Sequence, residues 1–232
     1  MAISQRTGSF TAFSAFLAIL LMTGACDAPA PGPRVEPSAG GSEDPGRGPS
    51  SPSPTAASPD APQVVGPAPR DLHDVDWAEV PVPGDFCGVP GLVRWNADGQ
   101  AVATSRTWGT VRLILGREVQ YGDTDGDQHD EAVVYVGCDD NGATQNTQLV
   151  ASYVVFDRVG DNLAAIGTIT PQQKSASYTT ALVRADFEPG RIIVHEKWYR
   201  PNDSHCCPSG DATTFWSREG NHLTPGAPRI TS

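Results

Sequence analysis

The acidic segment at residues 123–131, which reads DTDGDQHDE, has the residue types and spacing of a cation-binding loop. Proteins bind calcium through about six to eight oxygen atoms, and alternating carboxylates on a tight turn can direct several of these toward one centre. The candidate ligands are Asp123, Asp125, Asp127, the carbonyl group of His129, and Glu131 or Asp130. The alternative is a solvated turn in which the aspartate side chains accept hydrogen bonds from backbone amides without an ion.

The same segment resembles the DxDGDG-type loops that connect two strands in integrin-like β repeats. In those loops a second glycine allows a left-handed backbone, whereas this chain has Gln128 there, which adopts that conformation at some cost. Only one copy of the motif is present, so a propeller built from such repeats is excluded. The resemblance implies calcium as a structural ion and supplies no catalytic group.

Four cysteines follow the amino-terminal region: Cys87, Cys138, Cys206 and Cys207. An even number favours two disulfides if the domain is exported, as the amino-terminal segment described below predicts. We expect Cys206 and Cys207 to bond separately to Cys87 and Cys138, because a bond between neighbouring cysteines closes a strained ring. The alternatives are a Cys206–Cys207 bond that leaves Cys87 to pair with Cys138, and a zinc site including His205, although adjacent cysteines lack the usual ligand spacing.

No motif in the chain specifies a reaction, because a nucleophile elbow, a Walker loop and an HExxH sequence are all lacking. His195 and Glu196 are adjacent, so in a strand they point to opposite faces and cannot form a catalytic pair. Ser204 and His205 fall in a predicted turn, where such a pair is usually polar surface. We therefore expect a non-catalytic binding or structural module and no enzyme. The alternatives are a calcium-stabilised domain that binds a ligand or the cell wall, and an envelope hydrolase.

The amino terminus reads as a bacterial lipoprotein signal that ends before Cys26. Arg6 precedes an apolar run over about residues 10–22, and small residues then lead directly into Cys26, which is the order of a secretory signal. Residues 1–25 would be removed and Cys26 lipidated, although Thr23 stands where leucine is usual. Ordinary secretion and a retained anchor are the alternatives, but the run is shorter than the roughly 20 residues that a membrane span needs.

Composition separates a tether from a folded domain. Residues 26–70 follow the signal and, beyond Cys26, are rich in proline, glycine, alanine and serine without an aromatic residue, so they are predicted to be disordered. Residues 71–232 are long enough for one domain with its own core. The net charge of −11 argues against nucleic acid as a partner, because a phosphate backbone repels an acidic protein.

The domain's pattern is that of an all-β protein. Apolar and alternating segments separated by glycine, asparagine, aspartate and proline turns predict an antiparallel meander or sandwich-like domain with few or no helices. The expected strands cover residues 91–95, 101–106, 110–115, 131–138, 149–157, 163–170, 180–187, 191–199, 213–217 and 222–223. Asp98-Gly99 is expected to turn the first pair into a hairpin. Most aromatic residues fall in or beside these strands, where core packing is their usual role.

Several segments together resemble the actinobacterial LppP/LprE-type lipoproteins. They are the lipobox, the proline-rich tether, and the sequences GDFCGVPGLVRW, TWGTV, YGDTDGDQHDEAVVYVGC, SYVVFDRVG, GTITPQ and WYRPNDSHCCPSGDATTFW. The resemblance implies an extracytoplasmic location at the cell membrane, anchored by lipid. For a binding module in that place, a cell-wall or protein partner is the expectation. It identifies no catalytic residue.

Overall fold

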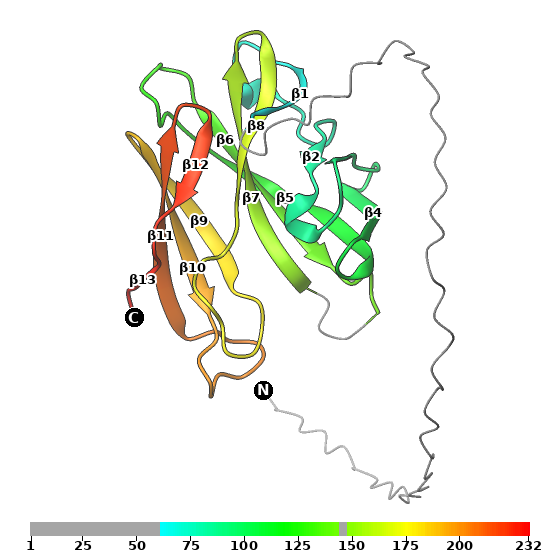
Figure 1. Ribbon diagram of the computed structural model, residues 1–232, viewed down its shortest axis with the longest axis vertical. Helices are drawn as coiled ribbons and strands as arrows, with labels where there is room; N and C mark the ends of the chain where they lie inside the picture. The colour runs from blue at the N-terminus through cyan, green and yellow to red at the C-terminus, as the bar shows by residue number, and fades with distance from the viewer. Residues whose placement is uncertain (1–60, 144–147) are drawn as a thin grey trace, which may run out of the picture. The chain divides into compact units, whose positions relative to one another are not determined.

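The computed structural model describes residues 61–143 and 148–232, and most of these residues form two antiparallel sheets that face each other (Figure 1). The first sheet has the order β1-β8-β7-β6-β5-β4 and the second the order β12-β11-β10-β9, with β13 paired to β11. The first contains β1 (Gln63–Pro67), β4 (Gln100–Ser105), β5 (Gly109–Gly122), β6 (Glu131–Asp139), β7 (Gln148–Val159) and β8 (Asn162–Ile169). The second contains β9 (Ala181–Glu188), β10 (Arg191–Trp198), β11 (Gly210–Glu219), β12 (His222–Pro225) and β13 (Arg229–Ile230).

The expected all-β class is therefore confirmed, and apart from β1 and β13 each sheet is a meander of consecutive antiparallel strands. The remaining elements of the described chain are short: β2 (Val82–Pro83) pairs with β3 (Leu92–Val93), and two 3-10 turns, η1 (Leu72–Asp74) and η2 (Asp85–Cys87), lie nearby. No helix in the described ranges is long and apolar enough to cross a bilayer.

The central strands of the first sheet are buried on both faces. On β6, Val134 and Val136 pack into one core cluster and Val133 into the other. On β7, Phe156 and Val155 divide in the same way. A strand covered on both sides needs apolar side chains at successive positions, which explains why the sequence of β6 is continuously apolar instead of alternating.

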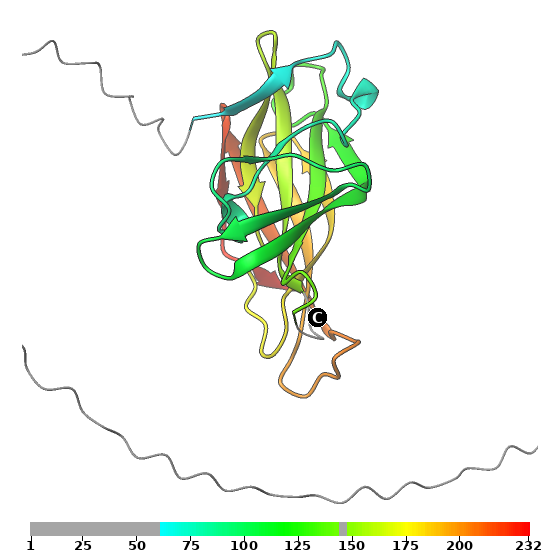
Figure 2. The same ribbon diagram turned by 90° about the vertical axis from the view of Figure 1, so that its right-hand side faces the viewer.

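The two cores have different covers. One lies between the facing sheets, where Ile192 and Trp216 of the second sheet meet the first. The other is covered by the segment before β4, shown in cyan and green in Figure 2, which packs Leu72, Trp77 and Val82 onto the outer face of the first sheet. Trp77 also donates a hydrogen bond of 2.9 Å from Nε1 to the hydroxyl of Tyr121, so its one polar atom is satisfied inside the core.

The expected tether boundary at residue 70 is wrong for its last part, because β1 (Gln63–Pro67) is an edge strand of the first sheet. Its residues pair with β8, from Gln63 opposite Ala165 to Pro67 opposite Asn162. A proline is tolerated there because an edge strand has a free side that needs no amide donor. The predicted signal segment, Cys26 and the predicted tether as far as residue 60 lie outside the described residues.

The predicted hairpin at Asp98-Gly99 is half correct. The turn forms, with Gly99 at a φ of 68° and the side chain of Asn96 accepting hydrogen bonds from the amides of Asp98 and Gln100. The strand before it, however, pairs with β2, while the strand after it pairs with β5. A turn signal fixes the local reversal of the chain, but burial against the core decides which strands become partners.

Candidate functional site

The acidic loop connects β5 to β6 and starts at a point of close packing between the sheets. A Cβ atom on Gly122, the last residue of β5, would collide with the side chain of Phe187 on β9. Glu131, the first residue of β6, is 1% exposed. The loop is therefore held between two fixed ends, one against the second sheet and one inside the protein.

Within the loop, aspartate side chains accept hydrogen bonds from the loop's own backbone. Asp123 accepts from the amides of Gly126 at 2.6 Å and Gln128 at 3.0 Å, and Asp127 accepts from the amide of His129 at 2.8 Å. Gln128 has a φ of 68°, the left-handed conformation expected from the loop motif. These contacts are those of the turn alternative, in which carboxylates cap backbone donors.

A buried arginine from the second sheet enters the same cluster. The side chain of Arg218 on β11 is 3% exposed. Its Nη2 lies 2.9 Å from Oδ2 of Asp125 and 2.6 Å from Oδ2 of Asp157, while its Nη1 contacts Glu131. Its Nε donates to the carbonyl group of Gly220 at 2.8 Å. We call Asp125, Glu131, Asp157 and Arg218 the arginine cluster.

Thr124 connects the arginine cluster to the turn between β9 and β10. Glu131 accepts hydrogen bonds from the amide of Thr124 at 2.7 Å and from its hydroxyl at 2.8 Å. The carbonyl group of Thr124 accepts from the amide of Gly190 at 2.7 Å, and the amide of Arg218 donates to the carbonyl group of Gly190 at 2.8 Å. Backbone and side-chain bonds thus join the two sheets at this end of the sandwich.

The arginine cluster holds more negative than positive charge, because one guanidinium faces three carboxylates. Burial raises the pKa of Asp157 to about 6, and the charges of Asp125 and Asp127 act in the same direction. Burial also lowers the pKa of Arg218, while Asp125 and Asp127 oppose that change. Arginine stays protonated in proteins, so a change of protonation in the cluster falls on a carboxylate, and burial outweighs the contact with Arg218 at Asp157.

The arrangement does not fit the calcium site expected from the sequence. The carboxylate oxygens of Asp123, Asp125 and Glu131 lie within 4.8 Å of one another, but the guanidinium of Arg218 already contacts two of these groups. Asp127 is not a member of that group. Calcium needs about six to eight oxygen ligands around its centre, and here a protein cation already pairs with two of the three carboxylates.

Asp130, the other candidate for the final ligand, is used elsewhere. Its Oδ2 lies 3.1 Å from Nε2 of His73, and the ring of His73 stacks on Tyr121 with 3.8 Å between the centroids. Asp130 therefore contacts the segment that covers the outer core and contributes nothing to the arginine cluster.

Arg218 is the functional residue that sequence reasoning missed, although a signal was present. Residues two apart in a strand face the same side, so Trp216, which is 5% exposed, indicates that Arg218 also points inward. An inward arginine needs carboxylate partners. The acidic loop is the densest source of carboxylates in the sequence, which would have suggested the pairing.

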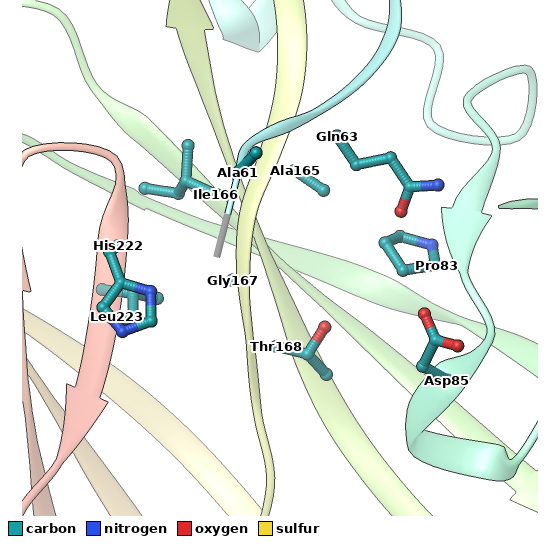
Figure 3. Close-up of a pocket in the computed structure, with 10 residues that line it drawn as sticks. All are labelled: Ala61, Gln63, Pro83, Asp85, Ala165, Ile166, Gly167, Thr168, His222 and Leu223. Atoms are coloured by element: carbon teal, nitrogen blue, oxygen red, sulfur yellow. The ribbon is translucent and has the colours of Figure 1, made fainter. Parts of the chain in front are cut away.

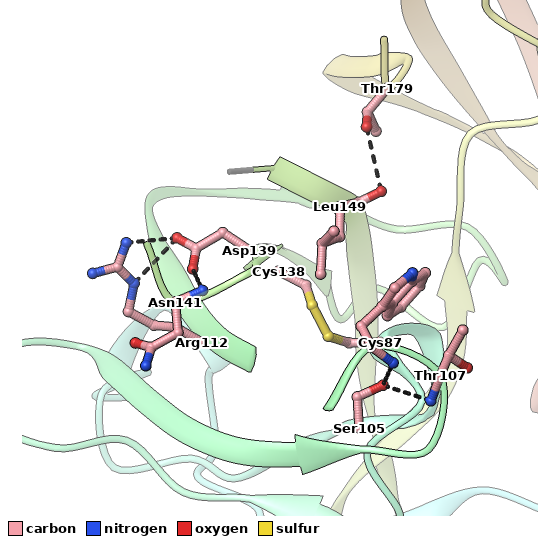
Figure 4. The surroundings of a disulfide bond; sticks show 10 residues. Cys87, Ser105, Thr107, Arg112, Cys138, Asp139, Asn141, Leu149 and Thr179 are labelled. Atoms are coloured by element: carbon pink, nitrogen blue, oxygen red, sulfur yellow. Dashed lines mark hydrogen bonds and ion pairs between the residues drawn. A yellow bond between two sulfur atoms is a disulfide. The ribbon is translucent and has the colours of Figure 1, made fainter. Parts of the chain in front are cut away.

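The disulfides are Cys87–Cys138 and Cys206–Cys207, so the expected separate pairing of the adjacent cysteines is wrong. Cys138 ends the apolar run of β6 and points into the outer core, where η2 brings Cys87 beside it, with Cα atoms 6.1 Å apart (Figure 4). Cys206 and Cys207 lie in an exposed loop after β10, on the other sheet. The fold therefore keeps Cys206 and Cys207 away from Cys87 and Cys138, and they bond to each other.

The expectation that His195 and Glu196 face opposite sides of a strand is confirmed by their partners. His195 lies 2.8 Å from a carboxylate oxygen of Asp186 on the outer face of β10. Glu196 is 1% exposed and accepts hydrogen bonds from the amides of Gln172 and Gln173 and from the hydroxyl of Thr214. The buried carboxylate thus fixes the start of the loop between β8 and β9.

That loop forms one wall of an open groove of about 580 Å³. The groove is lined by a mixture of apolar and polar groups, which come from residues 170–175 and 178–180, including Lys174 and Tyr178, and from Leu149 and Val150 of β7. Hydrogen bonds hold the loop on both sides: the hydroxyl of Thr180 donates to the carbonyl group of Gln173 at 2.8 Å, and the amide of Ala176 donates to the carbonyl group of Tyr199 at 2.9 Å. A preformed hollow of this size is suited to a small ligand or a short polymer segment.

A second hollow, of about 310 Å³, lies between β8, β12 and the segment that covers the outer core (Figure 3). His222 of β12 and Asp85 of η2 stand on opposite walls, with Gly167 and Thr168 of β8 between them. The two titratable side chains are separated by the width of the hollow and form no pair.

An aromatic binding platform would require several exposed tryptophans on one face of the domain. Trp216 is buried and Trp95 packs against the outer core, whereas Trp108 is 41% exposed. The indole nitrogen of Trp198 is buried, and its ring covers Gly210. The tryptophans therefore serve packing in the main, and they do not assemble into one exposed cluster.

Comparison with family models, with curated proteins and with solved structures finds no match to this chain.

Proposed function

We propose that this chain is a lipid-anchored extracytoplasmic lipoprotein of the LppP/LprE type whose β domain binds a partner in the cell envelope instead of catalysing a reaction. The observation that carries the proposal is Cys26, placed directly after an apolar run and small residues. The Cys87–Cys138 disulfide supports it, because a bond built into the core indicates folding in an oxidising compartment.

The anchoring part is tested by changing Cys26 to alanine in the full-length chain. The wild type should sediment with membranes and carry acyl mass on Cys26, whereas Cys26→Ala should remain unprocessed or appear in the soluble fraction. Thr23→Leu, which restores the usual residue of the lipobox, is the matched control and should keep the membrane location. Unmodified Cys26 in a processed, secreted protein would refute lipid anchoring.

A binding role for the groove is favoured by its construction. The buried carboxylate of Glu196 accepts hydrogen bonds from backbone amides of the groove wall. The wall is therefore fixed before a ligand binds. Its hydroxyl and amide side chains and Tyr178, with Lys174 as the one charged lining residue, suit a polar polymer such as a cell-wall glycan, since an aromatic ring offers a face for stacking and hydroxyls and amides offer hydrogen bonds. This is the proposed binding site of the domain.

The groove proposal is tested by co-sedimentation of the purified full-length chain with insoluble cell-wall glycan. Tyr178→Ala should lower the bound fraction several-fold, while Trp108→Ala, which removes an exposed aromatic side chain on the β4–β5 hairpin, should leave it unchanged. Equal binding of all three proteins would remove the groove from consideration, and loss only in Trp108→Ala would move the site to that hairpin.

A further inference from the structure

The loop between β10 and β11 carries a disulfide between neighbouring residues, Cys206 and Cys207, at the lower end of the domain in Figure 1. Both residues are exposed, and their Cα atoms are 3.7 Å apart. The hydroxyl of Ser204 lies 3.4 Å from the sulfur of Cys206. A reagent in solution can therefore reach this bond without any opening of the fold.

The loop keeps its shape through bonds that do not involve the disulfide. The carboxylate of Asp203 accepts from the amides of Arg200 at 2.7 Å and Ser209 at 2.8 Å, which closes the base of the loop. The hydroxyl of Tyr199 donates to the carbonyl group of His205 at 2.8 Å. None of these contacts uses a sulfur atom, so we expect the domain to stay folded when the bond is cleaved.

The two disulfides of the chain differ in both access and linkage. Cys87 and Cys138 are 0% and 1% exposed and stand 51 residues apart, so their bond restricts a long segment of the unfolded chain and stabilises the fold. A bond between adjacent residues restricts almost none of the chain, so its cleavage costs the fold little. Exposed disulfides that contribute little to folding are the ones that exchange with thiols.

We propose that Cys206–Cys207 is a thiol–disulfide exchange site that oxidises low-molecular-weight thiols. A thiolate attacks the sulfur of Cys207, forms a mixed disulfide there and displaces Cys206 as a thiolate, toward which the hydroxyl of Ser204 donates. A second thiolate attacks the sulfur of the small thiol in the mixed disulfide and releases the Cys207 thiolate. The two small thiols leave as their own disulfide, and both cysteines take up protons. Two electrons pass from the thiols to the protein.

The test treats the folded full-length chain with reduced and oxidised glutathione in varied ratio, followed by alkylation and peptide mapping. Cys206 and Cys207 should be alkylated at a glutathione concentration at least roughly tenfold below that which opens Cys87–Cys138. Far-UV circular dichroism should not change at that point. Opening of Cys87–Cys138 first, or of both bonds together with unfolding, would overturn the proposal.

Two variants distinguish oxidation of glutathione at Cys206–Cys207 from oxidation elsewhere in the protein. Cys206→Ala/Cys207→Ala should consume no glutathione under conditions in which the wild type forms one oxidised glutathione per chain. Ser204→Ala should slow formation of the mixed disulfide roughly threefold to tenfold, because the departing thiolate loses a hydrogen-bond donor. An unchanged rate in Ser204→Ala would overturn the role of Ser204, and glutathione oxidation by the double variant would overturn the assignment of the site.

Discussion

At the scale of single residues, Arg218 supplies the positive charge that partly neutralises the carboxylates at the acidic end of the domain. Its side chain is 3% exposed and contacts three carboxylates that belong to three different strands or loops. Removing one partner of a buried ion pair leaves the other charges without compensation, which typically costs about 3–5 kcal/mol. The residue stands where the sequence suggested a calcium ion.

The first prediction concerns Arg218 as the cation that takes the place of calcium in the acidic loop. Arg218→Met should lower the free energy of unfolding by about 3–5 kcal/mol, measured by urea denaturation. Millimolar calcium should then raise the melting temperature of the variant, because Asp123, Asp125 and Glu131 lack a counter-cation, and should leave the wild type unchanged. A wild type that melts higher in calcium than in chelator would contradict the assignment of Arg218 as the resident cation.

The second prediction concerns Asp157, whose pKa is raised by burial from 3.8 to about 6. The folded state binds this proton more tightly than the unfolded state, so the group's contribution to stability is complete below about pH 4 and is lost as the pH rises through 6. Asp157→Asn, which cannot ionise, should abolish this loss. The difference in unfolding free energy between the two proteins should change by on the order of 2 kcal/mol over that window, and parallel stability curves would refute it.

At the scale of elements, the approach of β5 to β9 positions the start of the acidic loop. Gly122 lies against the ring of Phe187 so closely that the site has no space for a methyl group. Overpacking of this kind typically costs about 1–3 kcal/mol. The glycine is needed for contact between the sheets, and not for an unusual backbone angle.

The third prediction follows from that contact. Gly122→Ala should destabilise the domain by about 1–3 kcal/mol in chemical denaturation, and Phe187→Leu in the same chain should recover part of the loss. Gly66→Ala on β1 is the matched control, since nothing lies within 4 Å of a Cβ atom there, and it should be nearly neutral. Equal effects of the two alanines would show that space is not the cause.

At the scale of the whole molecule, two cores share one sheet. The outer core depends on the covering segment before β4, which Cys87–Cys138 fastens to β6, whereas the inner core joins the two sheets. Damage to the covering segment therefore exposes one face of the first sheet while leaving the sandwich of the two sheets in contact.

The fourth prediction separates the two disulfides by their effect on the whole fold. Cys87→Ala/Cys138→Ala should lower the free energy of unfolding by about 2–4 kcal/mol. Cys206→Ala/Cys207→Ala should cost less than about 1 kcal/mol, because a bond between neighbours restricts little of the unfolded chain. Urea denaturation of both variants under oxidising conditions gives the comparison, and a reversed order of stability would contradict the structure.

Local chemistry determined a large part of this protein before its tertiary structure was considered. The apolar run of β6 indicated a buried strand, the glycine, proline and asparagine turns indicated meanders, and the acidic motif indicated the left-handed Gln128. Each of these depends on residues close together in the sequence. The same holds for the opposite facing of His195 and Glu196, which follows from the two-residue period of a strand.

Only the tertiary structure decided what meets across long separations. It paired Cys87 with Cys138, placed Arg218 among carboxylates 61 to 93 residues away, and recruited Gln63–Pro67 as an edge strand from a segment that reads as a tether. In each case the sequence offered several partners of equal chemistry. The choice followed from which faces the sheets bury, and that depends on packing the whole chain at once.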